Sequence, residues 1–238
     1  MQVQFLTWQL SVERIKPTPE ELVETYNSIA DQWQQKIQRF GYDRAYASLF
    51  TGLHDDLRNS FTKSETMHST TSVLDCGVGS GALSAALFKS NIGHLRLYGV
   101  DTSPEMATVA RTHLAQQGIS IQTRRQDVRN LPYTDNMFGM VMTAHTIEHL
   151  PRPQVGIQEM VRVLQPDAPL LIMTTRPSFL GSLVDLQWGL TCMAEAKLVE
   201  MFENAGLYDV QPVQFGGPFW CRRMSYALIG WKRQPVPS

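Results

Sequence analysis

Three aspartates, each directly after a short apolar run, are the residues whose placement first indicates chemistry. Asp75, Asp101 and Asp127 end three successive predicted strands. In open sheets of parallel strands, ligands bind at the carboxyl ends of the strands. We therefore expect the three carboxylates to converge on one ligand.

A glycine-rich turn follows the first aspartate. Gly77, Gly79 and Gly81 lie between Asp75 and a predicted helix over 82–89. Glycine lets backbone approach a ligand closely, and the helix start behind it is a typical ligand site. The spacing also satisfies the dinucleotide-binding fingerprint, but a carboxylate at Asp75 would hinder a pyrophosphate and suits an ammonium group. The turn alone thus indicates a nucleotide-type ligand; the alternative is a tight turn that needs glycine for packing.

The other two aspartates suit a nucleoside. Asp101 can accept hydrogen bonds from both hydroxyls of a ribose; the alternative is a helix cap, a role that Ser103 already fits. Asp127 could accept from an exocyclic adenine amine while Val128 packs on the ring. An aspartate after a strand is also ordinary turn chemistry. A site of this kind further requires a hollow beside Gly77 to Gly81.

A fourth candidate region follows the predicted strand over 138–143. His145 stands where a substrate or part of a cofactor would lie, and Glu148 and His149 follow it. Their spacing is not that of a zinc site, so we expect no bound metal. His149 is interpreted as a packed structural histidine.

The order of the elements indicates the fold class. From residue 72 onward, short apolar runs alternate with helical segments, which predicts a parallel sheet covered by helices on both faces. The last two predicted strands, 208–215 and 225–231, are separated by a loop with Gly216-Gly217-Pro218 and should pair as an antiparallel hairpin. Seven strands are expected in all.

The front of the chain is expected to be a separate helical unit. Thr18 can cap a helix, and Glu21 can complete a capping box with it. We predict a helical cap over 1–66, a polar linker over 59–71, and a core domain over 67–238.

Composition narrows the class of protein. The net charge of −1 and pI of about 6.6 offer no concentrated basic surface, so no nucleic-acid partner is expected. Three scattered cysteines form neither a disulfide framework nor a metal knuckle, which favours a reducing compartment. With no signal peptide and no apolar run of about 20 residues, we expect a soluble, cytoplasmic protein without stable membrane insertion. The oligomeric state cannot be inferred from the sequence.

Taken together, the segments resemble the class I S-adenosylmethionine (SAM)-dependent methyltransferases, especially the small-molecule branch with the ubiquinone- and menaquinone-pathway enzymes. The likeness covers about residues 72–175 and includes Leu131-Pro132 before Phe138, Ile147-Glu148-His149-Leu150, and Arg162-Val163-Leu164-Gln165-Pro166. It implies a Rossmann-like, seven-stranded, mostly parallel sheet with a C-terminal hairpin and an N-terminal helical lid. It also implies methyl transfer from SAM to a small-molecule acceptor, at oxygen, nitrogen or carbon, with S-adenosylhomocysteine as the product.

The resemblance also implies roles for individual residues. His145 is the candidate base or substrate orienter; the alternative is that it packs beside the cofactor. Tyr26, Trp33, Arg176 and Trp188 are candidates for the substrate pocket. The residues that resemble cofactor contacts are Asp75, Gly77, Gly79, Gly81, Asp101, Thr102, Met106, Asp127, Val128, Thr143 and Ala144.

Two other functions are compatible with parts of the sequence. One is a SAM-binding partner or sensor without catalytic activity, which no sequence feature excludes. The other is an NAD-dependent oxidoreductase, which the glycine spacing permits. Asp75, the helical front segment and the terminal hairpin argue against the oxidoreductase.

Overall fold

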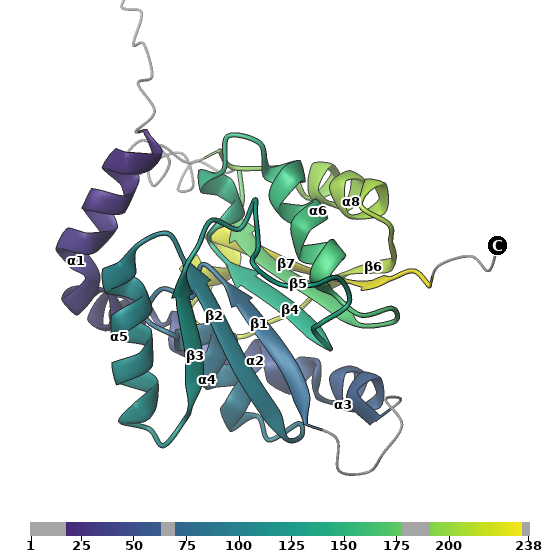
Figure 1. Cartoon of the computed structure of the whole chain (residues 1–238), viewed down its shortest axis with the longest axis horizontal. Coiled ribbons are helices and arrows are strands. Elements are labelled where there is room, and N and C mark those ends of the chain that lie inside the picture. Colours follow the sequence, from purple (N-terminus) through teal and green to yellow (C-terminus); the bar gives the residue numbers. More distant parts are fainter. Residues whose placement is uncertain (1–17, 63–69, 178–190, 235–238) are drawn as a thin grey trace, which may run out of the picture.

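One mixed sheet forms the centre of the molecule (Figure 1). The computed structural model describes residues 18–62, 70–177 and 191–234. Within them the strand order is β3-β2-β1-β4-β5-β7-β6; the first five strands run parallel, and β7 pairs antiparallel with both β5 and β6. This confirms the Rossmann-like sheet with a terminal hairpin. The strands are β1 (Thr71–Cys76), β2 (Leu95–Asp101), β3 (Ile121–Arg125), β4 (Met140–Ala144), β5 (Pro169–Thr175), β6 (Leu207–Val213) and β7 (Ser225–Lys232).

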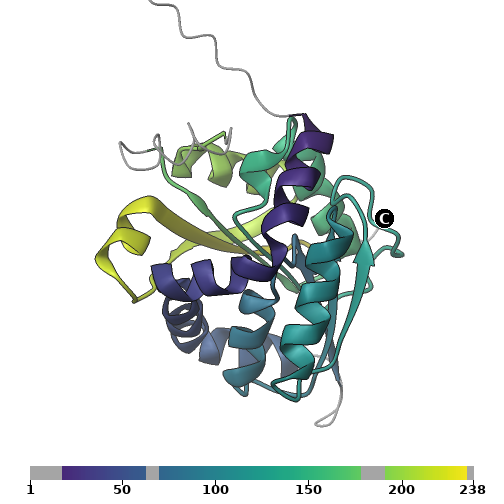
Figure 2. The ribbon, with the colours of Figure 1, turned by 90° about the vertical axis from the view of Figure 1, so that its left-hand side faces the viewer.

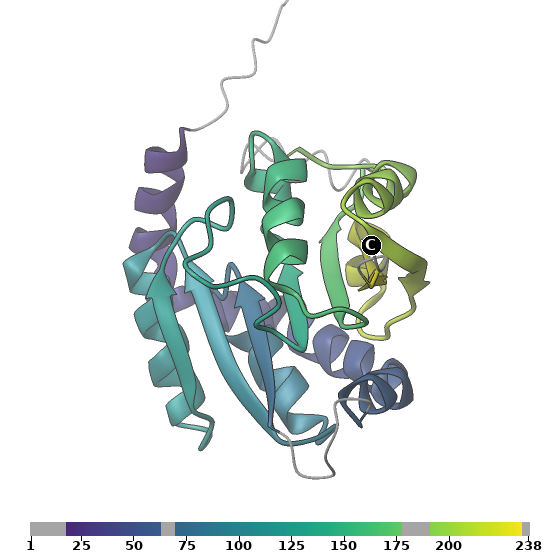
Figure 3. The same ribbon diagram turned by 45° about the vertical axis from the view of Figure 1, so that its right-hand side comes forward.

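Helices cover both faces of the sheet, and each face has its own apolar core. Alternation along β1 sends Val73 to one core and Leu74 to the other, as expected for a strand buried on both faces. Figure 3 shows α6 in front of the strands and α4 behind them. The helices that flank the strands along the chain are α4 (Ala82–Lys89), α5 (Pro104–Ala115), α6 (Pro153–Val163) and α8 (Glu195–Asn204).

Three further helices precede the sheet. They are α1 (Pro19–Phe40), α2 (Tyr42–Gly52) and α3 (His54–Thr62). The capping box is present: the Thr18 amide donates to Glu21 Oε2 (2.7 Å), and the Glu21 amide donates to Thr18 Oγ1 (3.2 Å). Gly41, at φ 75°, separates α1 from α2, so that α1 lies along α5 while α2 packs on α4 (Figure 2).

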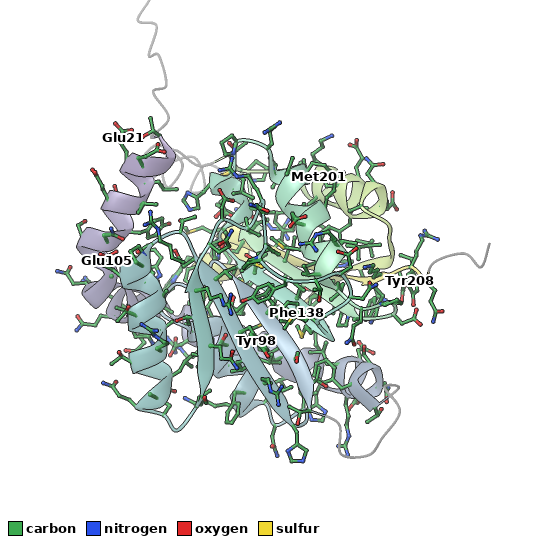
Figure 4. All side chains as sticks on the ribbon, in the orientation of Figure 1. Glu21, Tyr98, Glu105, Phe138, Met201 and Tyr208 are labelled. Carbon is green, nitrogen blue, oxygen red and sulfur yellow. The ribbon has the colours of Figure 1, made fainter. Side chains whose placement is uncertain are left out.

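An aromatic cluster supports the face of the sheet that α6 covers. The rings of Tyr98 and Phe138 lie 5.3 Å apart in an edge-on arrangement, and Tyr133 contacts both (Figure 4). Phe138 was expected to begin the fourth strand, but it forms only an isolated bridge with Leu164, and β4 starts at Met140.

Two predictions about connections were wrong. The expected linker over 59–71 is occupied at its start by α3, which continues to Thr62 because Phe61 is buried in the core, and at its end by β1. The hairpin loop contains a short helix, α9 (Phe219–Met224), which buries Cys221. The division into a cap over 1–66 and a core over 67–238 stays a proposal.

No helix among the described residues is long and apolar enough to cross a membrane.

Candidate functional site

The glycine turn after β1 has a backbone that side chains rarely adopt. Gly77, Gly79 and Gly81 have φ of 70°, 51° and 77°. A Cβ on Gly77 would lie 2.1 Å from Thr146 Oγ1, and one on Gly81 would lie 2.8 Å from the Leu114 side chain. At these two positions, therefore, glycine is required because a larger side chain would collide with its neighbours, as expected for a tightly packed turn.

Gly79 is the glycine that faces outward. A Cβ there would meet only the indole of Trp33, at 3.5 Å, and the Gly79 amide donates to Asp101 Oδ2 (3.0 Å). The turn therefore presents Gly79 and the Asp101 carboxylate side by side at the carboxyl edge of the sheet.

Two carboxylates lie next to this turn, Asp75 buried and Asp101 half-buried. Asp75 is 2% exposed, and its Oδ2 accepts from Ser84 Oγ (2.7 Å). Burial raises the pKa of Asp75 to about 7, and the charge of Asp101 adds to the shift. Burial also raises the pKa of Asp101, against hydrogen bonds from the amides of Ser103 and Gly79. Among the described residues neither carboxylate has an ion-pair partner, an arrangement that suits a positively charged, hydrogen-bond-donating ligand.

His145 lies at the carboxyl end of β4, in a strained conformation with φ 55°. Its Nδ1 lies 3.2 Å from both Glu148 Oε1 and Thr175 Oγ1. Its Nε2 is buried with no hydrogen-bond partner among the described residues, and the ring of Tyr42 packs edge-on against the imidazole, with 5.0 Å between ring centroids. An unpaired buried nitrogen next to a carboxylate-bound nitrogen is a candidate acceptor for a substrate proton.

Glu148 holds His145 in place. It is 1% exposed and accepts from Thr174 Oγ1 (2.7 Å) and from the amide (3.2 Å) and hydroxyl (3.0 Å) of Thr175. Burial acts to raise the pKa of Glu148, but the hydrogen bond and charge of His145, with the other donors, lower it to about 2. An ionised Glu148 accepts from a proton on Nδ1 of His145, and when the ring is neutral Nε2 is left as the acceptor.

Helix α1 lies over the glycine turn. Ser80 Oγ donates to Gln34 Oε1 (2.7 Å), and Ser103 Oγ donates to Asn27 Oδ1 (2.6 Å). The expected hollow beside the turn is therefore covered in this conformation, because α1 supplies polar partners as well as the indole of Trp33. The turn lines neither of two cavities, of about 170 and 310 Å³, found elsewhere in the described part of the chain.

A fourth α1 contact reaches the segment after β4. Tyr26 and His149 are joined through Tyr26 Oη and His149 Nε2 at 3.0 Å. Burial raises the pKa of Tyr26 and lowers that of His149, so a neutral phenol and a neutral imidazole share this hydrogen bond. Of the predicted pocket residues, Tyr26 and Trp33 thus lie at the site, whereas Trp188 lies outside the described residues.

Known proteins are similar to this chain in sequence and in fold. Residues 74–172 match a family profile described as "Methyltransferase domain". The chain is 30% identical over 170 residues to 2-methyl-6-phytyl-1,4-hydroquinone methyltransferase 1, chloroplastic, of Oryza sativa subsp. japonica, a match over 71% of this chain and 50% of that protein. Residues 74–172 thus carry the sequence of a methyltransferase domain.

Two further comparisons agree with this assignment. The ubiquinone/menaquinone biosynthesis C-methyltransferase UbiE of Neisseria meningitidis is 27% identical over 132 residues, 56% of this chain and 54% of that one. A solved complex between the Haloferax volcanii Trm112 methyltransferase activator and a putative methyltransferase superposes with a TM-score of 0.65 at 17% identity, covering 88% of this chain and 98% of that one. The chain spans about half the length of the curated relatives it matches.

The third aspartate of the methyltransferase domain differs from the other two. Asp127 follows β3, which lies next to β2 in the sheet. Arg129 Nε donates a hydrogen bond to each of its two carboxylate oxygens (3.0 Å to each). Hydrogen bonds from Arg129 lower the pKa of Asp127. An adenine amine would have to share these oxygens with Arg129.

The remaining predicted cofactor residues are mostly enclosed. Met106 and Val128 are buried, and Thr143 is buried with its hydroxyl donating to the Cys76 carbonyl (2.6 Å). Ala144 is half-buried, and Thr102 is exposed. For these five residues, contact with the cofactor remains a prediction.

The sequence analysis missed four residues of the site. Glu148 could have been recognised from its position three residues after His145 in a helical turn, Ile147–His149. Asn27, Gln34 and Tyr42 carried no such signal, because their partners lie far away in the chain.

Proposed function

We propose that this chain transfers a methyl group from SAM to a small-molecule acceptor. The observation that carries the proposal is a pair of carboxylates, the buried Asp75 and the half-buried Asp101, beside the outward-facing Gly79. No cation among the described residues balances them. The methyltransferase domain over 74–172 supports the same activity.

The residues at this edge fit SAM. Bound SAM would supply an electrophilic methyl group on a sulfonium. Asp101 would accept from the ribose hydroxyls, Asp75 would face the amino group of the methionine moiety, and Gly79 would lie beneath that moiety. Asp127 would take the adenine amine.

His145 would act on the acceptor. With Nδ1 bound to Glu148, its Nε2 can accept a proton from, or orient, the group that is methylated. Holding the two reactants in line can contribute roughly 7–11 kcal/mol to lowering the barrier, so orientation alone is a substantial role. The names of the relatives support a quinone-type or other small aromatic acceptor.

The proposed surroundings are those of a cytoplasmic protein with a small-molecule acceptor and no nucleic-acid partner. The buried thiols of Cys76 and Cys221 and the near-neutral net charge support this placement.

The test combines binding with turnover. The full chain should bind SAM but not NADH in calorimetry. With SAM and an acceptor from a panel of phenols and hydroquinones, it should form S-adenosylhomocysteine. Binding without product from the panel or from cell extract would favour the sensor function. Wild-type turnover by His145→Ala across pH would remove the role of His145.

A further inference from the structure

A cavity of about 170 Å³ lies at the carboxyl end of β5, where β7 begins. It is at the same edge of the sheet as Asp75 and Asp101, but on the far side of His145. Its lining comes from the residue after β5, the start of α8, the end of β6 with its following loop, α9 and the start of β7. The residues used here are Arg176, Glu195, Arg222, Ser225 and Tyr226.

The first arginine of this cavity is held in position. Arg176 Nη1 lies 3.3 Å from Glu195 Oε2, and Arg176 Nε donates to the Ser225 carbonyl (3.3 Å). Its guanidinium also stacks on the ring of Tyr226, 5.0 Å from the centroid. A planar donor fixed on three sides has lost most of the freedom that ligand binding would otherwise cost.

The second arginine leaves the cavity with an excess of positive charge. Arg222, on α9, has no ion-pair partner among the residues that the structure describes. The described lining holds two guanidinium groups, Arg222 being exposed, and one carboxylate, that of Glu195, so it carries one more positive than negative charge. Guanidinium groups pair with carboxylates and phosphates through two parallel hydrogen bonds.

The cavity is one side chain away from His145. The Ser225 hydroxyl and the Tyr42 hydroxyl are hydrogen-bonded at 3.0 Å, and the Tyr42 ring packs on His145. A ligand with one end in the cavity would thus extend past Tyr42 toward Nε2 of His145.

We propose that this cavity binds an anionic group of the methyl acceptor, a carboxylate or a phosphate monoester, at a distance from the atom that is methylated. The inference rests on the proposed function, because it names the class of acceptor for the same site. Arg176 and Arg222 are the residues that select it.

The experiment uses matched acceptors that differ only in the anion. Catechol, 3,4-dihydroxybenzoate and 3,4-dihydroxyphenyl phosphate are given to the full chain with SAM. The same compounds are titrated by calorimetry into the chain saturated with S-adenosylhomocysteine. The variants are Arg222→Gln and, as a control, Arg223→Gln, because Arg223 is the next residue on α9 and stacks on Phe219 instead of lining the cavity.

We expect the anionic acceptors to bind best, and Arg222→Gln to weaken them by about 10-fold or more while Arg223→Gln and catechol show little change. Comparing the affinities of the carboxylate and phosphate acceptors identifies which anion the cavity prefers. The inference is overturned if catechol binds as well as its anionic counterparts, if no anion binds, or if both variants behave alike.

The dissociation constant of SAM is measured on each variant in the same series. If the wild-type chain binds SAM but binds anionic acceptors no better than catechol, this inference alone is rejected. If the wild-type chain does not bind SAM, the proposed function is rejected.

Discussion

Asp75 and Glu148 are two carboxylates at the same edge of the sheet, 2% and 1% exposed, yet their pKa values move in opposite directions. Asp75 has one side-chain donor, Ser84, and burial raises its pKa to about 7. Glu148 is buried as deeply, but four donor groups from His145, Thr174 and Thr175 surround it, and its pKa falls to about 2. Burial thus does not set the charge of a carboxylate by itself; the hydrogen-bond donors and the charges around it contribute as well.

This difference separates the two halves of the candidate site. The half at β1 and β2 holds carboxylates that no cation in the described part of the chain pairs with, and α1 covers it. The half at β4 and β5 holds a hydrogen-bond network around Glu148 that positions His145. An arginine-lined cavity lies beyond it. The following predictions test this contrast, from the largest expected effect to the smallest.

Glu148→Gln should destabilise the fold most. The amide keeps one acceptor oxygen and turns an NH₂ group toward donors, so we expect the free energy of unfolding to fall by about 3 kcal/mol. Urea denaturation at neutral pH measures it. A loss under about 1 kcal/mol would show that the network around His145 is not tightly matched.

Asp75→Asn should act in the opposite direction. Because the folded pKa of Asp75 is raised from 3.8 to about 7, its protonation stabilises the fold below pH 4, and this stability is lost as pH rises to about 7. The variant cannot ionise, so at pH 8 we expect it to be more stable than the wild type by about 2–4 kcal/mol, from a shift of roughly three pKa units. Thermal unfolding between pH 4 and 8 checks the slope; identical pH profiles for both proteins would contradict the raised pKa.

Asp101→Ala should separate the cofactor half from the acceptor half. We expect SAM affinity to fall by ~10- to 100-fold from the loss of charged hydrogen bonds to ribose, as measured by calorimetry. Arg222→Gln is the matched comparison in the other half and should leave SAM affinity as it is. Unchanged affinity in Asp101→Ala would contradict the assignment of Asp101.

Gln34→Ala should have the smallest effect. If α1 must leave the glycine turn before SAM enters, removing the bond from Ser80 raises the fraction of open protein, and SAM should bind about 2- to 5-fold more tightly. Gln35→Ala, an exposed neighbour on α1, is the control. Weaker SAM binding by Gln34→Ala would instead mean that α1 holds the cofactor.

Much of the cofactor half could be predicted because its chemistry is local. A strand, a glycine turn and a capped helix are short-range features, so the Asp75 and Asp101 positions, the capping box at Thr18 and the terminal hairpin follow from neighbouring residues. The errors were local as well: the buried Phe61 extends α3 into the expected linker, and α9 interrupts the expected loop.

What the sequence alone determined is therefore the fold class, the family and the acidic strand ends, since each depends on residues close together in the chain. Only the tertiary structure decided which groups from other parts of the chain contact the site residues. Helix α1 folds back onto the turn, Thr174 and Thr175 of β5 complete the site of Glu148, and Arg176 and Arg222 line one cavity. Those contacts join segments that only the strand order brings together, and no local pattern encodes that order.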